Sequence, residues 1–283
     1  MAATWHAELD AVLLCGDVGT FTHDSQLDNA TRSHAKLDPG ELEFLRQWAV
    51  APQPAWIKRI FQPSDQGGRG LECPVVMVHG NHEGFEHLEK LIPSAVPNDP
   101  IAMSSLPTVD TGGYIRYLPS GWRCVSPSGL VVGGVGGMER GQRRVHYHEM
   151  AYIDEEAVLR LLDGPKLDVL ITHQGPSETQ GDKGSELLQP LLDAGIARVW
   201  FHGHAIPNPE VRTVGETTVV PLGGATFLNK GADAGDPGPL AWARVESTPA
   251  IQVDRSRASS WREFRRRHWR ELPNGQLVWP GLL

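Results

Sequence analysis

Five apolar runs recur along the chain, and each of them ends at a glycine, a histidine or an aspartate. Their residues are largely aliphatic and β-branched, and turn-forming residues border each run. Short runs of this kind predict buried β-strands. The five predicted strands span Ala11–Asp17, Pro74–His82, Leu130–Gly137, Leu167–His173 and Ala197–His204.

Amphipathic patterns that predict helices lie between these strands. The stretches Gly84–Leu91, Asp154–Gly164 and Lys183–Gly195 place apolar side chains at helical spacing, and the last two end at a glycine. The stretch Leu37–Trp48 offers Asp38 as an N-cap, with a proline directly after it. Strands that alternate with helices predict an α/β layered fold.

Two regions are less regular. Thr20–Leu71 is a long insertion between the first two strands, expected to be helical in part, although His23–Asn29 within it is expected to be a solvated loop. Gly235–Glu246 predicts a last strand, and the Arg- and Trp-rich stretch Asp254–Pro273 favours an amphipathic C-terminal helix over a basic contact for a phosphate-rich partner. We expect a domain over residues 1–250, with its insertion at 20–71, and an extension over 251–283.

Length, charge and cysteine content narrow the class of protein. A chain of 283 residues is long enough for one α/β domain with additions. Its net charge of −8 gives no support to a nucleic-acid partner, although a local basic patch would be compatible with one. Three separated cysteines without a Cys-x-x-Cys pair favour a reducing, cytoplasmic location. The sequence shows no signal-peptide or membrane-span pattern, so no membrane contact is expected.

The polar residues at the strand ends form a candidate metal site. They are Gly16-Asp17, Gly80-Asn81-His82-Glu83, Thr172-His173 and His202-Gly203-His204. Loops from several strands of an α/β sheet converge beyond the carboxyl ends of those strands, where ligands bind. Carboxylate, amide and imidazole ligands suit Mn²⁺, iron, Zn²⁺ or Ni²⁺ better than Ca²⁺. The lack of a cysteine cluster argues against a closed structural zinc site.

The order Gly-Asp, Gly-Asn-His-Glu, Thr-His and Gly-His resembles the calcineurin-like metallophosphoesterases. The resemblance covers roughly Asp10–Phe227, and the wording of "GNHEGFEHLEKL", "GYIRYLPSG" and "GLVVGGVGGMERG" is similar to the lariat-debranching branch. The resemblance implies a sandwich of two mixed β-sheets flanked by helices. It also implies a phosphoester substrate.

By position, the resemblance implies a ligand set for divalent metal. Asp17 resembles the carboxylate that bridges two metals, and Asn81 and His173 resemble ligands of the second metal. His204 is a ligand in either of the two alignments given below. The expected cofactor is therefore one or two divalent transition-metal ions.

The resemblance also implies catalytic roles for two neighbouring residues. His82 resembles the histidine that contacts the phosphate and protonates the leaving group, and Glu83 would hold that imidazole from behind. A histidine can carry a proton near neutral pH, so the residue type suits a general acid. We expect a hydrolase that uses a metal-activated water. The alternative is a degenerate, non-catalytic module that binds metal or phosphate.

The chain departs from the family pattern at two places. The family ends its motif series with Gly-His-x-His. Here either Gly203-His204 is the motif and Ile206 replaces the last histidine, or His202 and His204 are themselves the pair. The family also begins with a strand that ends in Asp-x-His, which is missing from the residues before Asp17. Either the native start lies upstream of Met1, or the chain is a variant with one strong metal site.

Overall fold

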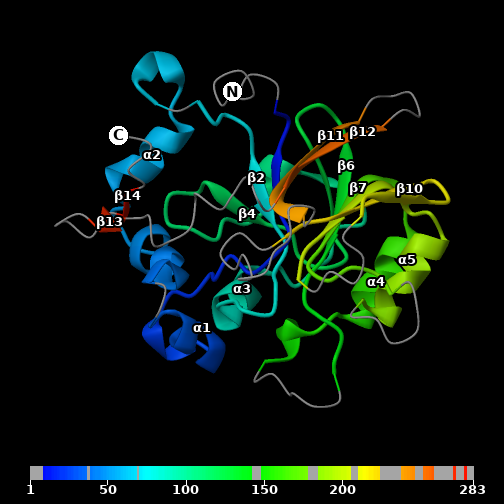
Figure 1. Cartoon of the computed structure of the whole chain (residues 1–283), viewed down its shortest axis with the longest axis horizontal. Coiled ribbons are helices and arrows are strands. Elements are labelled where there is room, and N and C mark those ends of the chain that lie inside the picture. Colours follow the sequence, from blue (N-terminus) through cyan, green and yellow to red (C-terminus); the bar gives the residue numbers. More distant parts are fainter. Residues whose placement is uncertain are drawn as a thin grey trace.

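The computed structural model describes residues 9–36, 39–68, 70–141, 148–177, 184–204, 210–223, 237–245, 251–257, 270–271 and 277–278. In these residues two β-sheets pack face to face, and helices cover their outer faces (Figure 1). This is the mixed α/β fold, with two sheets flanked by helices, that the sequence predicts.

The smaller sheet has three parallel strands in the order β1-β2-β4. They are β1 (Val12–Leu14), β2 (Val75–Met77) and β4 (Ile115–Tyr117). An isolated antiparallel bridge joins Thr108 to Arg116 beside β4. Because β1 and β2 are parallel neighbours, the loops that follow them leave the sheet at the same edge.

The larger sheet has seven strands in the order β3-β5-β6-β7-β8-β10-β9. Strands β6, β7, β8 and β10 are parallel, whereas β5 and β9 run antiparallel to their neighbours β6 and β10. The bounds are β3 (Ile101–Ala102), β5 (Arg123–Val125), β6 (Val131–Val135), β7 (Leu167–Thr172), β8 (Ala197–His202), β9 (Arg212–Val214) and β10 (Thr217–Pro221).

Side chains that alternate in direction along the strands form the core between the two sheets. Val76 of β2 faces inward, while its neighbours Val75 and Met77 pack on the outer face. In the same way Val199 of β8 faces inward and Trp200 faces outward. Successive side chains of a strand point to opposite faces, so each sheet buries apolar residues on both sides.

Helices cover both outer faces. The helices α4 (Glu155–Asp163) and α5 (Gln189–Asp193) pack on the outer face of the larger sheet. On the smaller sheet, α3 (Phe85–Leu91) and part of the insertion form the outer layer. None of the helices in the described part of the chain is both long enough and apolar enough to span a membrane.

The insertion folds into short helices that pack on the smaller sheet. Gln53 donates hydrogen bonds to Asp110 at 2.9 Å and to the carbonyl of Trp48 at 2.8 Å, and Phe61 stacks on Tyr114. These contacts anchor the insertion to the loop before β4. The short helices of the chain are η2 (Asp24–Gln26), α1 (Asn29–His34), η3 (Pro39–Leu42), η4 (Phe44–Trp48), α2 (Ala55–Phe61), η5 (Ser64–Gln66), η6 (Met103–Ser105), η7 (Glu149–Ala151) and η8 (Glu186–Leu188).

The five predicted strands and the predicted helices that end near Leu91, Gly164 and Gly195 are confirmed. Residues 39–48 form a 3-10 turn and a π-helical turn instead of one helix, and Leu37 and Asp38 lie outside the described residues. The strand expected at Gly235–Glu246 is confirmed by β11 (Pro237–Val245), but it is not the last, because further strands follow it.

The prediction of a helix in Asp254–Pro273 is wrong at Asp254–Arg257 and at Arg270–Glu271, which are strands, and residues 258–269 and 272–273 lie outside the described residues. Strand β12 (Ile251–Arg257) pairs antiparallel with β11, and β13 (Arg270–Glu271) pairs with β14 (Leu277–Val278). Pairing with β11 places Val253 against the main core, and this tertiary contact outweighs the local helical pattern.

Candidate metal centre

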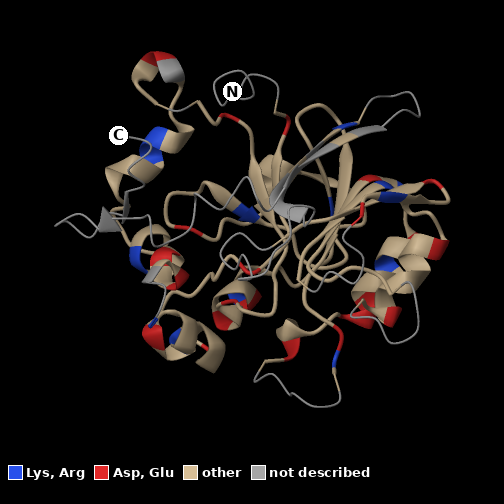
Figure 2. Cartoon of the chain, viewed as in Figure 1, with Lys and Arg blue, Asp and Glu red and all other residues tan. Residues whose placement is uncertain are grey.

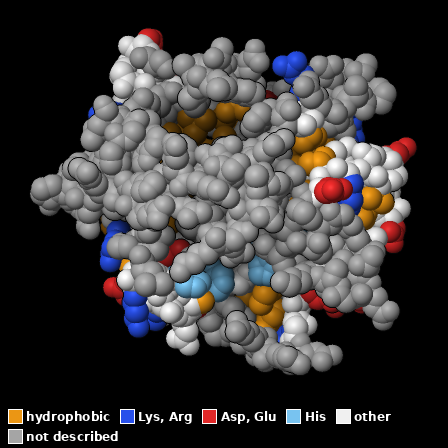
Figure 3. All heavy atoms as spheres, in the orientation of Figure 1, with side chains coloured by type: hydrophobic (Ala, Val, Ile, Leu, Met, Phe, Trp, Pro, Cys, Tyr) orange, Lys and Arg blue, Asp and Glu red, His pale blue; other side chains and the backbone are white. Residues whose placement is uncertain are grey.

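The predicted site residues lie at the carboxyl ends of four strands. Asp17 follows β1, Asn81 follows β2, His173 comes directly after β7, and His204 follows β8. In β1, β2, β7 and β8 these ends point toward one edge of the sandwich, so residues far apart in the sequence meet there. Histidine side chains reach the surface on the face shown in Figure 3.

Two glycines allow the loops after β1 and β2 to approach each other closely. A Cβ on Gly16, whose φ is +91°, would lie 2.7 Å from the backbone nitrogen of Gly80 and from Nδ1 of His173. A Cβ on Gly80 would lie 2.1 Å from Oδ1 of Asp17. Only glycine fits at these two positions. The close approach lets the backbone N–H groups of Asn81 and His82 each donate to Asp17 Oδ1 at 2.9 Å.

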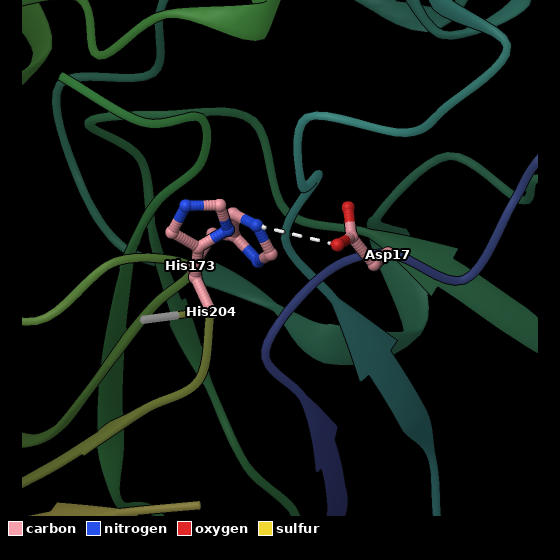
Figure 4. Close-up of side chains that lie close together, drawn as sticks. All are labelled: Asp17, His173 and His204. Carbon is pink, nitrogen blue, oxygen red and sulfur yellow. Dashed lines mark ion pairs between the residues drawn. The ribbon is translucent and has the colours of Figure 1, made fainter. Parts of the chain in front are cut away.

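Asp17, His173 and His204 converge as a potential metal-binding group. One ligand atom from each lies within 4.8 Å of the others, and Figure 4 shows the three side chains together, with the His173–Asp17 pair dashed. Nε2 of His173 lies 3.5 Å from Oδ2 of Asp17. The rings of His173 and His204 lie 4.7 Å apart between centroids. His173 is buried, whereas Asp17 and His204 are exposed, so the group opens to solvent on one side.

The contacts of His173 direct its Nε2 atom into this group. Nδ1 lies 2.8 Å from the carbonyl oxygen of Cys15, which can only accept, so Nδ1 carries the proton. Nε2 is then the atom available to a metal ion, and it lies 2.9 Å from Oδ1 of Asn81 and 3.5 Å from Oδ2 of Asp17. A cation among these three atoms would satisfy all of them, so the residues fit a metal ion.

The backbone is strained at two of the candidate ligands. Asp17 has a φ of 56° and His204 a φ of 55°, the only two non-glycine residues with positive φ in the described chain. This left-handed conformation is uncommon for residues other than glycine, and such strain concentrates at functional sites. Partial desolvation by itself would raise the pKa of Asp17, but the electrostatic interaction with the His173 and His82 imidazoles and the backbone N–H of His82 bring the pKa below its ordinary value. Asp17 is therefore ionised, as a ligand must be.

His82 forms a pair with Asp28, a residue that the sequence analysis placed in a solvated loop. Nδ1 of His82 lies 2.9 Å from Oδ2 of Asp28. Asp28 is also the N-cap of α1, since Oδ1 accepts from the backbone N–H of Thr31 at 2.8 Å. Burial lowers the pKa of His82, but the hydrogen bond to Asp28 and the charge of Asp17 outweigh it and raise the pKa overall. The solvated-loop prediction is therefore wrong at Asp28. The Asp-x-x-Thr capping pattern was the available signal.

Glu83 does not hold the His82 ring, which corrects the role expected for it. The Glu83 side chain is fully buried, and its two oxygens accept from the backbone N–H groups of Val18, Thr20 and Gly80 and from the hydroxyl of Thr20. Burial raises its pKa to about 7, with the Thr20 N–H acting in the opposite direction. Glu83 therefore fastens the loop after β1 to the loop after β2, and so fixes Asp17 relative to Asn81.

His202 lies outside the converging group. It is 1 % exposed, and burial lowers its pKa to about 4, so the ring is neutral. A Cβ on Gly175 would lie 2.5 Å from the His202 ring, which shows how closely this ring packs beneath the loop after His173. Of the two histidines, only His204 joins Asp17 and His173. Ile206 lies outside the described residues.

Comparison with known proteins gives one family match. The family model described as calcineurin-like phosphoesterase matches residues 4–207. No curated protein matches the sequence. Among solved structures, the crystal structure of TT1561 of Thermus thermophilus is similar, with 15% identity, a TM-score of 0.39, and 87% of this chain and 96% of that chain covered. A second crystal structure has 14% identity, a TM-score of 0.44, and coverage of 89% and 91%.

Proposed function

Because this chain belongs to the calcineurin-like phosphoesterase family, we propose that it is a metal-dependent phosphoester hydrolase. The observation that carries the proposal is the convergence of ligand-type atoms from Asp17, His173 and His204, with Oδ1 of Asn81 2.9 Å from Nε2 of His173. Asp17, Asn81, His173 and His204 would hold the ion, and the mixed N/O donor set suits Mn²⁺, iron, Zn²⁺ or Ni²⁺.

The bound ion would supply positive charge to the phosphate oxygens and lower the pKa of a coordinated water. The chain supplies the remaining chemistry. His82 donates its proton to the leaving oxygen, and Asp28 orients the ring and favours its protonated form. Glu83 acts at a distance from the substrate, because it fixes the two loops that present Asp17 and Asn81.

We propose that one ion is bound tightly. Within the described ranges, a single group of three or more acidic, histidine or cysteine ligand atoms lies close enough together to bind a metal. We also propose a finer likeness to the lariat-debranching branch. Assays with phosphomonoesters and phosphodiesters would decide which of the two classes of ester the chain hydrolyses.

Two further parts of the proposal concern the whole chain. We propose a phosphoesterase domain over residues 1–250 and an extension over 251–283, in which β12 fixes the start of the extension to the domain by pairing with β11.

We also propose a cytoplasmic location. Its support is that Cys15, Cys73 and Cys124 are all free thiols.

Hydrolysis by the purified chain tests this function. The chain is stripped with a chelator and reloaded with Mn²⁺, Fe²⁺, Zn²⁺ or Ni²⁺, and turnover of p-nitrophenyl phosphate and bis(p-nitrophenyl) phosphate is followed. We expect turnover that depends on added metal and is lost in His173→Ala. The exposed His23→Ala should keep it and serves as the matched control. Metal binding without turnover of either ester would favour the non-catalytic module, and turnover by the stripped chain would overturn the proposal.

A further inference from the structure

Two buried hydrogen bonds meet at Thr172, the residue directly before His173. The indole N–H of Trp200 in β8 donates to Oγ1 of Thr172 in β7 at 2.7 Å. The Thr172 hydroxyl in turn donates to the carbonyl oxygen of Gln174 at 2.6 Å. An indole N–H can only donate and a carbonyl can only accept, so these two bonds fix the direction of the hydroxyl. The second bond closes a short turn that encloses His173.

The backbone of His173 couples this turn to the second histidine of the site. The N–H of His173 donates to the carbonyl of Val135 in β6 at 3.2 Å, and the carbonyl of His173 accepts from the N–H of Gly203 at 3.0 Å. Gly203 directly precedes His204. A change in the turn at His173 would therefore move the backbone that presents both His173 and His204.

The surroundings of the turn leave it little room. A Cβ on Gly175 would lie 2.5 Å from the His202 ring, and the carbonyl of Gly175 accepts from the N–H of Ser185 at 2.8 Å. Thr172 and Trp200 are each 0 % exposed. Because solvent does not reach the Thr172 hydroxyl, loss of its hydrogen bonds has to be compensated by a shift of the turn itself.

The two hydrogen bonds join neutral groups, so their influence on the site is geometric. Figure 2 shows charged residues on the covering helix α4, which has Glu155 and Glu156 in its first turn and Arg160 in its last. The bonds at Thr172 lie in the buried layer of the sheet instead. Linked hydrogen bonds in such a layer strengthen one another and favour a single arrangement of the groups that they join.

We propose that Thr172 is a positioning residue for the metal centre, whose hydroxyl fixes the turn that presents His173 and, through Gly203, His204. The inference rests on the proposed function, because the two histidines are ligands only if the site holds an ion. Thr172 acts through the backbone, since its hydroxyl is engaged by Trp200 and Gln174.

Thr172→Val tests the hydroxyl, because valine keeps the shape of threonine and removes both hydrogen bonds. Calorimetric titration with Mn²⁺ after chelator treatment gives the metal affinity, and urea unfolding gives the stability. We expect Thr172→Val to weaken Mn²⁺ binding about 10–100-fold, the usual effect of losing a group that orients a ligand. Thr172→Ser restores the hydroxyl and should recover the parental affinity. Should the valine variant not fold, Thr172→Ala removes the same hydroxyl with less bulk, and it should bind Mn²⁺ as weakly.

Thr217→Val is the matched control. Thr217 is 1 % exposed, and its hydroxyl donates to the carbonyl of Ala197 at 2.6 Å, at the amino end of β8. The control loses the same kind of bond from the same sheet, so it should lower stability and keep the parental Mn²⁺ affinity. Parental affinity in a folded Thr172→Val variant would overturn the inference. An equal loss of affinity in Thr217→Val, or no recovery in Thr172→Ser, would overturn it as well.

A second measurement, on the metal-free chain, separates this inference from the proposed function. Nδ1 of His173 lies 2.8 Å from the carbonyl oxygen of Cys15, and ring-nitrogen NMR spectra report whether that contact persists. We expect shifted His173 ring signals in Thr172→Val and parental signals in Thr217→Val. A parent chain that binds no metal would count against the proposed function, and the ring spectra would then decide the inference. Parental His173 signals in Thr172→Val would overturn it.

Discussion

Asp28 combines two roles that substitutions can separate. One oxygen caps α1 by accepting from Thr31, and the other pairs with His82. Asp28→Asn keeps a good N-cap but removes the charge, and Asp28→Ser keeps the cap but is too short to reach the ring. Asp28→Ala removes both contacts. The three variants therefore divide the effect of the cap from the effect on the proposed general acid.

The structure sets the size of each effect. Loss of an N-cap costs about 0.5–2 kcal/mol. The pKa of Asp28 is lowered to about 2 from an ordinary 3.8, with burial opposing the shift and His82 and Thr31 producing it. After allowance for solvent screening, that shift corresponds to about 1–2 kcal/mol of stability. We therefore expect Asp28→Ala to lose about 2–3 kcal/mol, and Asp28→Asn and Asp28→Ser to lose about 1–2 kcal/mol.

The sign of the pH dependence of stability follows from the pKa shifts of both Asp28 and His82. The lowered pKa of Asp28 stabilises the fold above about pH 4, and this contribution is lost as pH falls toward 2. The raised pKa of His82 stabilises the fold below about pH 6.5, and this contribution is lost as pH rises through the folded-state value. The stability difference between the parent chain and Asp28→Asn should therefore be largest between about pH 4 and about pH 6.5.

Two measurements check this prediction. Urea unfolding across the pH range gives the stability differences. Hydrolysis of an alkyl phosphate and of a nitrophenyl phosphate gives the effect on proton donation. Asp28→Asn and Asp28→Ser should slow the alkyl ester about tenfold or more and the nitrophenyl ester much less, because only the poor leaving group needs the proton. Equal slowing of both esters, or a stability difference that does not vary with pH, would refute the reasoning.

Three further substitutions distinguish metal ligands from the proposed general acid and from residues that only stabilise the site. His82→Ala should retain the metal and slow alkyl esters by about 10²–10⁴-fold; a metal content that falls with the rate would show that His82 is a ligand. Glu83→Gln should lower stability by about 1–3 kcal/mol and weaken metal binding, because the new amide cannot accept from Thr20 and Val18 as the carboxylate does; unfolding curves and metal affinity that match those of the parent would contradict this. His202→Ala should lose about 1–3 kcal/mol by leaving a cavity, while metal affinity stays the same, and loss of the metal would make His202 a ligand.

The strands, and the residues that meet at the candidate site, could be predicted because both depend on local pattern. Val76 and Val199 lie in apolar runs that can only be buried, and Asp17, Asn81 and His173 follow such runs at the edge where parallel strands end. The sequence alone could show which residues reach this edge, but not which side chains touch.

Asp28 and Glu83 illustrate what the sequence could not show. Asp28 lies 54 residues before His82 in the chain, and only the tertiary fold brings the two side chains within 2.9 Å. Glu83 is adjacent to His82 in the chain, yet its side chain points to the backbone of Val18 and Thr20. The strand at Ile251–Arg257 was missed for the same reason, because its partner β11 determines its conformation.

Metal titration of the parent chain and of His204→Ala is the most direct test of the central claim that strand-end residues hold a catalytic ion. Calorimetric titration with Mn²⁺ after chelator treatment should show one tightly bound ion per chain. His204→Ala should weaken that affinity by about 100-fold or more, since it removes one ligand of the group with Asp17 and His173. A parent chain that binds no Mn²⁺, Fe²⁺, Zn²⁺ or Ni²⁺, or a folded His204→Ala variant with the parental affinity, would contradict the account.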